Sequence, residues 1–247
     1  MKIFLITGGD STLAKCFKLF YPEKSILLSK KQCNITLKDS IKQAFKKYNF
    51  THVINTAAIT DIELCEKKPL KCISVNAYGV SLLNEACLKY KKKLIHISSN
   101  YAVNPVNIYG WSKYFSEKVV SHKYLVIRTS FYSKKTYLVK ILTNKHLSAY
   151  QNVYFNPISI NELVKQIYKL CDYYGIVNIF SSKKISNYQF AKYLYKVFRL
   201  NNQKKIKKKR FKNNKNNAFR PLNSYIKSDI EIDILDDLKE FKTHIET

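Results

Sequence analysis

The sequence has no long apolar run and no closely spaced cysteine pair. None of its hydrophobic stretches has the roughly 20 residues of a membrane-spanning helix, and the opening run at 3–6 is too short for a signal-peptide core. Its six cysteines are scattered without a C-x-x-C pair, which matches neither the spacing of zinc sites nor a dense disulfide scaffold. We therefore expect a cytoplasmic protein with reduced thiols, no metal and no membrane partner.

Acidic residues are also scarce: 17 Asp and Glu face 44 Lys and Arg, giving a net charge of +27. Such a charge attracts polyanions, so a nucleic-acid-binding protein is one class to consider. The lysines are spread over predicted helix faces, however, and the densest basic run, residues 204–215, is typical of a solvated loop. Anionic small molecules benefit from the same field. The net charge alone therefore does not distinguish an enzyme with anionic ligands from a nucleic-acid-binding protein. Because the lysines are dispersed, we expect no nucleic-acid partner.

The first half of the chain alternates short apolar runs with amphipathic stretches, without a Gly/Ser-rich or Pro-rich linker. This alternation is typical of βαβ units, whose crossovers are right-handed. We therefore predict an α/β fold with a doubly wound parallel sheet of the Rossmann type, which binds ligands at the carboxyl ends of its strands. The predicted strands are 2–7, 25–28, 52–55, 93–98 and 124–129, and the predicted helices are 13–20, 37–48, 69–90 and 109–120.

The second half is less regular. We predict helices over 161–173 and 188–198, with a short strand at 176–180 between them. Residues 1–132 are expected to form the sheet domain. The remainder, 133–247, is expected to form a small C-terminal lobe, with a part at about 153–180 returning to the sheet.

A glycine turn joins the first predicted strand to the first helix, in the segment Thr7-Gly-Gly-Asp-Ser-Thr-Leu-Ala14. A dinucleotide-binding fold needs a tight turn here, because the pyrophosphate lies at the N-terminus of the following helix. Gly8 supplies the turn, whereas Ser11 replaces the middle glycine and brings a Cβ towards the phosphates. The loop alone does not distinguish a dinucleotide site from an ordinary turn.

Two further segments follow strands at the same predicted edge. Ser29, Lys30 and Lys31 come after the second strand, with no acid that would bind a ribose 2′-hydroxyl, so they favour NADP over NAD. Ala57 and Ala58 follow the third strand and leave room for a flat ligand, although simple helix–sheet packing explains them equally well.

The strongest signal is Tyr109-Gly-Trp-Ser-Lys113, because a tyrosine and a lysine four residues apart share one helix face. The ammonium of Lys113 would favour the tyrosinate form there. A tyrosine so placed can donate a proton to a carbonyl oxygen while a hydride reaches the carbon. Ser98 and Ser99 close the preceding strand and can present a hydroxyl to the same carbonyl. Together these elements favour a reductase.

The sequence resembles the extended short-chain dehydrogenases, and most specifically the dTDP-4-dehydrorhamnose reductase family. The resemblance runs nearly from end to end and is most specific between Val53 and Glu117. It is carried by the glycine turn at Gly8, by the segments 33–36, 53–60, 63–66, 75–79, 96–101, 107–113 and 126–130, and by Arg220 with Pro221.

The resemblance implies reduction of the 4-keto group of a nucleotide-linked 4-keto-6-deoxy sugar with NADPH or NADH. By it, Tyr109 is the proton donor, Lys113 lowers the tyrosine pKa while binding the nicotinamide ribose, and Ser99 hydrogen-bonds the keto oxygen. Residues 1–132 would bind NAD(P), and 133–247 would mainly bind the substrate. The residues expected to bind the cofactor are Gly8, Ser11, Thr12, Leu13, Lys30, Asn34, Ala57, Ala58, Asn76 and Lys113.

The sequence also departs from the family. Ser11 replaces a glycine, Asn34 and Asn100 replace aspartates, and the stretch between Tyr101 and Tyr109 is shorter. A shortened pocket loop also suits a non-catalytic member of this fold, such as the regulatory subunit of methionine adenosyltransferase. The intact reacting trio favours the enzyme. A nucleotide sugar is the expected partner. The sequence leaves open whether the chain forms a homodimer.

Overall fold

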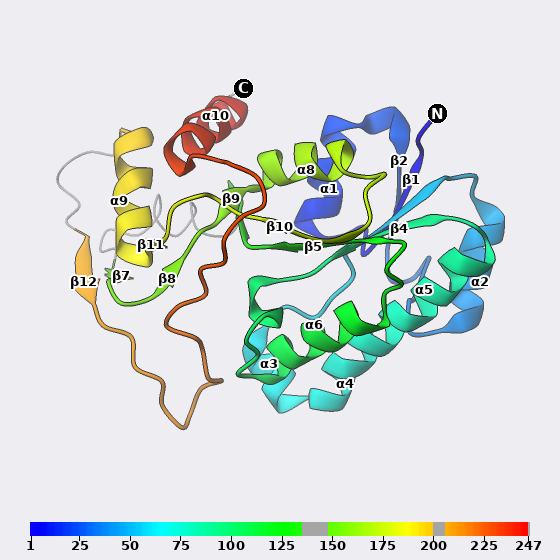
Figure 1. Cartoon of the computed structure of the whole chain (residues 1–247), viewed down its shortest axis with the longest axis horizontal. Coiled ribbons are helices and arrows are strands. Elements are labelled where there is room, and N and C mark those ends of the chain that lie inside the picture. Colours follow the sequence, from blue (N-terminus) through cyan, green and yellow to red (C-terminus); the bar gives the residue numbers. More distant parts are fainter. Residues whose placement is uncertain (135–147, 200–205, 247) are drawn as a thin grey trace. The chain divides into compact units, whose positions relative to one another are not determined.

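A six-stranded sheet has the strand order β2–β1–β3–β4–β5–β10 (Figure 1). Neighbouring strands from β2 to β5 pair in parallel, and the order reverses between β1 and β3, which is where such sheets bind ligands. This confirms the predicted doubly wound α/β fold. The strands are β1 Phe4–Thr7, β2 Ser25–Leu28, β3 His52–Asn55, β4 Lys93–Ile97, β5 Leu125–Thr129 and β10 Gly175–Ile179.

The structure is a computed structural model that describes residues 1–134, 148–199 and 206–246. The chain divides into two units. Met1–Arg128 and Val164–Val177 form the first unit, and Thr129–Leu163 and Asn178–Thr247 form the second.

The central strands are buried along their whole length because helices cover both faces of the sheet. Every residue of β1 and β3 is buried, as expected for strands of a parallel sheet. Successive side chains of β1 point to opposite faces. Phe4 packs its ring against Phe17 and Tyr168 at centroid distances of 5.1 and 5.8 Å, whereas Leu5 belongs to a cluster with Phe45 and Leu83 on the other face.

Helices α1 and α8 lie on one side of the sheet and α3 to α6 on the other (Figure 1). No helix among the described residues is long and apolar enough to cross a membrane. The helices of this region are α1 Thr12–Phe20, α2 Lys38–Lys47, α3 Ile62–Lys67, α4 Pro69–Ile73, α5 Gly79–Lys89, α6 Ile108–Val119 and α8 Ile160–Lys169, with the 3₁₀ turns η1 Pro22–Lys24 and η3 Asn100–Ala102.

The helix predicted over 69–90 is present, but it contains a π-helical turn, η2, at Ser74–Tyr78. A π turn inserts one extra residue into the helical ladder, and such turns are frequent at functional sites. The buried Asn76 lies in this turn.

Helix α3 was not predicted, although Asp61 caps it by accepting a hydrogen bond from Leu64 N at 3.0 Å.

The described residues of the second unit form three two-stranded pairs and two helices. Three aromatic rings meet in its core, where Tyr132 packs against Phe190 and Phe241 at centroid distances of 5.2 and 5.1 Å. Strand β6 Phe131–Tyr132 pairs with β9 Ile158–Ser159, β8 Tyr154–Phe155 pairs with β11 Ile185–Ser186, β7 Ser148–Tyr150 pairs with β12 Lys207–Lys209, and the helices are α9 Asn187–Val197 and α10 Ile234–Glu246.

The basic run at 204–215 is not entirely a loop, so that prediction was wrong for Lys207–Lys209. These lysines form β12, which pairs in parallel with β7. Gln151 N donates to Lys209 O at 2.9 Å, and the lysine side chains are exposed. Lysine-rich segments suit such edge strands because their charges oppose further pairing. Residues 204 and 205 lie outside the described residues.

The carboxylate of Asp237 joins α10 to β6 and β9 in the core of the second unit. It is 5% exposed and accepts hydrogen bonds from Tyr132 OH at 2.8 Å, from Ser159 N at 2.6 Å and from the Ser159 hydroxyl. Asp237→Ala leaves these donors buried without a partner. We expect it to lower the free energy of unfolding by roughly 3 kcal/mol, measured by urea unfolding followed by circular dichroism.

The neighbouring Asp236 provides the control, because its exposed carboxylate pairs with Lys239 at the surface. Asp236→Ala should change the free energy of unfolding by less than about 1 kcal/mol. Equal losses in the two variants would contradict the assignment of Asp237 to the core network.

Candidate active site

A cleft of about 450 Å³ lies at the carboxyl ends of β1 and β3. It brings together six of the residues predicted to bind the cofactor: Gly8, Ser11, Lys30, Asn34, Ala57 and Ala58. Its other lining residues are Asp10, Cys33, Ile35, Thr56, Ile59, Leu64, Lys71 and Val75. A second hollow of about 650 Å³ shares Asp10, Lys30 and Asn34 with the cleft and adds Ser29 and Lys31.

Gly8 forms the floor of the cleft and has a conformation that favours glycine. Its φ is +69°, and an added Cβ would lie 2.7 Å from the backbone nitrogen of Ala57. The turn after β1 therefore contacts the segment after β3 at backbone distance. Any side chain at residue 8 would separate these two segments.

Ser11 lines the cleft, and its hydroxyl is engaged by the start of the following helix. Its Oγ accepts a hydrogen bond from Ala14 N at 3.1 Å as the N-cap of α1, and lies 2.8 Å from Thr56 Oγ1. Replacement of the usual glycine therefore adds a helix cap and a link to β3. Thr12 is the first residue of α1, and the side chain of Leu13 is buried in the core. Neither lines the cleft, so any contact of theirs to an anion would use the helix N-terminus.

The side chain of Ser99 lies beside that of Tyr109, near enough for its hydroxyl to act on the pKa of the phenol. Ser99 is 6% exposed at the start of η3, and it also donates to Asn100 Oδ1 at 3.1 Å. Asn100 therefore still provides an acceptor where the family has an aspartate. Tyr109 is half-buried in the first turn of α6, which Asn107 caps by accepting from Gly110 N at 2.8 Å.

The phenol of Tyr109 is held in its protonated form. Burial raises its pKa to about 12, although the hydrogen bond to Ser99 opposes this rise. The sequence predicted that Lys113 would favour the tyrosinate, and this role stays a prediction; in the structure the lysine amine donates to Ile97 O. A protonated phenol is the form that donates a proton.

Lys113 lies one turn further along α6, and its side chain is buried with 2% exposure. Its Nζ donates to Ile97 O at 2.7 Å and lies 3.4 Å from His96 Nε2. Burial lowers the lysine pKa to about 8, although the carboxylate of Glu117 opposes this change. Glu117 itself accepts a hydrogen bond from Ser98 and pairs with Arg128 at 2.6 Å.

The orientation of Asn55 decides which nitrogen of His96 carries the proton. Asn55 Oδ1 accepts from Thr7 Oγ1 at 2.7 Å and from Ala57 N at 3.2 Å, so its Nδ2 faces His96 Nδ1, at 3.1 Å. Nδ1 therefore accepts, and Nε2–H donates to Ser116 Oγ at 2.9 Å. Burial and the nearby Lys113 hold the His96 pKa well below its usual value, so the ring is neutral.

Asn76 supports the site, and both the oxygen and the nitrogen of its side-chain amide already have hydrogen-bond partners. Its Oδ1 accepts from Ile59 N at 2.7 Å, and its Nδ2 donates to Ile59 O and Ser112 Oγ, both at 2.9 Å. Ser112 in turn donates to Tyr109 O at 2.7 Å. Asn76 thus connects the cleft wall at Ile59 to the backbone of the tyrosine. A direct cofactor contact by Asn76 stays a prediction.

The sequence reasoning missed several residues of the site. Thr56, Asp10 and Lys71 line the cleft, and His96 contacts Lys113. Thr56 directly follows β3 and Asp10 lies in the turn after β1, so the rule that ligands bind beyond the carboxyl ends of strands could have found them. Lys71 and His96 carry no comparable signal in the sequence.

The family described as the RmlD substrate binding domain matches residues 1–247. The chain belongs to this family. Among the curated relatives, the spore coat polysaccharide biosynthesis protein SpsK of Bacillus subtilis is 27% identical over an alignment of 210 residues, and the match covers 74% of this chain and 74% of that protein. A dTDP-4-dehydrorhamnose reductase of Mycolicibacterium smegmatis is 34% identical over 110 residues, covering 38% of this chain and 33% of that one.

Solved structures share the fold of this RmlD-family chain. A dTDP-4-dehydrorhamnose reductase from Clostridium acetobutylicum matches with a TM-score of 0.89 and 23% identity, and the match covers 100% of both chains. Another from Bacillus anthracis, solved in complex with NADP, matches with a TM-score of 0.88 and 24% identity over 100% of this chain and 99% of that one. The fold and the family predicted from the sequence are confirmed.

The low pKa of Lys113 predicts a stability change at alkaline pH. In the unfolded chain the amine has its ordinary pKa of 10.5, against about 8 in the folded protein. Between these values the unfolded chain holds a proton that the folded protein has released. The free energy of unfolding should therefore gain a rising contribution from pH 8 to 10.5.

This contribution should reach roughly 3 kcal/mol and should disappear in Lys113→Met. Urea unfolding of both proteins at a series of pH values measures it as the difference between them, so that titrations common to both cancel. A difference that stays flat across the window would show that the buried amine has an ordinary pKa.

Proposed function

We propose that the protein is an NAD(P)H-dependent oxidoreductase that reduces the 4-keto group of a nucleotide-linked 4-keto-6-deoxy sugar. One observation carries the proposal: the Ser99 side chain lies beside the Tyr109 phenol, with Lys113 one helical turn away. Family membership and relatives named as sugar-nucleotide reductases support it. The structural neighbours with NADP and with NAD⁺ support the predicted cofactor.

The cleft fits a dinucleotide by its own construction. Gly8 allows backbone approach, α1 directs its N-terminus to this edge, and Lys30 and Lys31 supply positive charge beyond β2. Ala57 and Ala58 would lie along the cofactor. A bound reduced nicotinamide would supply the hydride.

The side chains of the trio would provide the proton and hold the carbonyl. Tyr109 donates its phenolic proton to the keto oxygen as negative charge develops there, and Ser99 offers a second hydroxyl to the same atom. Lys113, in its ammonium form, would stabilise the resulting tyrosinate. Because its pKa is only about 8, this ammonium form is lost in mildly alkaline solution.

Tyr109→Phe tests the proton donor, because phenylalanine keeps the ring and removes the hydroxyl. We expect kcat for a dTDP-4-keto-6-deoxy sugar to fall by about 10³-fold, while NADPH affinity, measured by fluorescence, stays nearly unchanged. Tyr114→Phe is the control, since Tyr114 lies on the same helix and packs against Trp111 and Phe115. Full activity in Tyr109→Phe would disprove the mechanism, and no NADPH binding by the unaltered protein would favour the non-catalytic alternative.

The two lysines after β2 should select NADPH over NADH. The double variant Lys30→Ala, Lys31→Ala should weaken NADPH binding by about tenfold and leave NADH binding nearly unchanged, because only NADPH carries the 2′-phosphate. The exposed pair Lys46 and Lys47 on α2 gives a control that removes the same charge. If both double variants weaken NADPH binding equally, the preference comes from the general positive field.

A further inference from the structure

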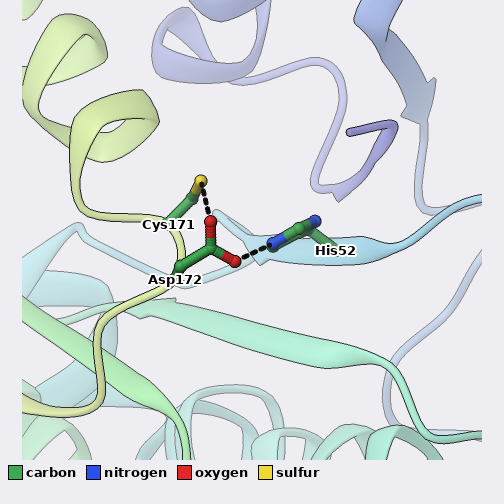
Figure 2. Close-up of side chains that lie close together, drawn as sticks. All are labelled: His52, Cys171 and Asp172. Carbon is green, nitrogen blue, oxygen red and sulfur yellow. Dashed lines mark hydrogen bonds and ion pairs between the residues drawn. The ribbon is translucent and has the colours of Figure 1, made fainter. Parts of the chain in front are cut away.

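In the first unit, three side chains of types that bind metals meet at the end of the sheet opposite the cleft. His52 is the first residue of β3, and Cys171 and Asp172 follow α8 (Figure 2). One ligand atom from each lies within 4.8 Å of the other two. His52 Nε2 is 3.3 Å from Asp172 Oδ1, and Cys171 Sγ is 4.0 Å from Asp172 Oδ2.

These separations are close to those of a tetrahedral zinc site. With bonds of about 2.0–2.2 Å to nitrogen and oxygen and about 2.3 Å to sulfur, neighbouring ligand atoms lie roughly 3.3 to 3.6 Å apart. The nitrogen and oxygen already have this spacing. The sulfur lies within 4.8 Å of both other ligand atoms and must move closer to them to complete the site.

The surroundings hold the ligands as metal sites do. His52 has a side chain that is 5% exposed, its Nδ1 lies 2.8 Å from Thr51 Oγ1, and its ring packs against Phe4 at 5.0 Å. A hydrogen bond to the second ring nitrogen is the usual device that orients a ligating histidine. Cys171 is 1% exposed, whereas the carboxylate of Asp172 is 45% exposed and opens the cluster to solvent.

Two ammonium groups already occupy this cluster. Lys2 Nζ lies 2.5 Å from Asp172 Oδ2 and 3.2 Å from Cys171 Sγ, and Lys93 Nζ contacts Asp172 Oδ1. The sulfur and the carboxylate thus converge on a position that holds positive charge. Both lysine side chains are largely exposed, at 40% and 53%, and can turn into water, because exposed ion pairs contribute little to stability.

We propose that His52, Cys171 and Asp172 bind a divalent cation of the zinc class, which takes the place of the Lys2 ammonium. A sulfur, a nitrogen and a carboxylate favour Zn²⁺ over Mg²⁺ or Ca²⁺. On binding, the metal–sulfur bond forms as the Cys171 thiol releases its proton to the buffer, and Lys2 moves into solvent with its own proton retained. Water would fill the fourth position.

Cobalt substitution tests the ligands directly. The full chain, free of any histidine tag and kept reduced, is titrated with Co²⁺, and the thiolate-to-cobalt charge-transfer band is recorded before Zn²⁺ displaces the cobalt. We expect one equivalent with a sulfur band. Cys171→Ser should lose the band and weaken Zn²⁺ binding, measured by chelator competition, by about tenfold or more.

Cys16→Ser, at another buried thiol, should keep the band and the affinity. Bound cobalt without a sulfur band, or equal effects of the two serine variants, would overturn the proposal.

Lys2→Gln provides a test that misfolding cannot imitate. Removing the competing ammonium should strengthen Zn²⁺ binding severalfold, whereas a damaged protein would bind more weakly. Lys15→Gln, at an exposed position of α1, should leave the affinity unchanged. An unaltered affinity in Lys2→Gln would show that the metal does not replace Lys2. Because the cleft lies at the other edge of the sheet, NADPH affinity serves as a control that should not respond to zinc.

Discussion

The side-chain amide of Asn55 connects the sheet to the reacting residues. Its oxygen is fixed by Thr7 of β1 and by Ala57 at the cleft, so its nitrogen must face His96. That contact sets the tautomer of a neutral histidine that lies beside Lys113. One amide therefore links Ala57 at the cleft to the histidine that lies beside the buried lysine. A carboxylate at residue 55 would instead place a negative charge against this histidine.

Burial pushes the tyrosine and the lysine towards their neutral forms. The phenol keeps its proton because its pKa is raised to about 12, and the amine has a pKa of about 8. The chain has a net charge of +27, and Lys30 and Lys71 bring part of this charge to the cleft. The positive field of the surface can attract an anionic ligand, while the reacting groups stay protected from water.

Patterns along the sequence predicted the sheet well, because apolar runs and the residues after them are local features. Strands β2 and β3 have the predicted bounds, and Tyr109 and Lys113 lie on the same helix as expected. The short strands of the second unit have two or three residues each and carry no detectable alternation. The division into a cofactor domain and a substrate lobe, and the roles of the site residues, stay predictions.

Contacts between distant segments could not be predicted from the spacing of residues along the sequence. Ser11 turns towards Thr56, and Cys171 meets His52 across the sheet edge, although neither pair forms a linear motif. The π turn at Ser74–Tyr78 was not predicted either, since its composition is that of any helix.

This π turn constrains the number of residues in the helix as well as their types. Deleting one residue there would remove the extra residue and restore a regular α-helical ladder, so that the bulge that places the Asn76 amide against Ile59 would be lost. We therefore infer that this turn accepts substitutions far more readily than changes in its number of residues.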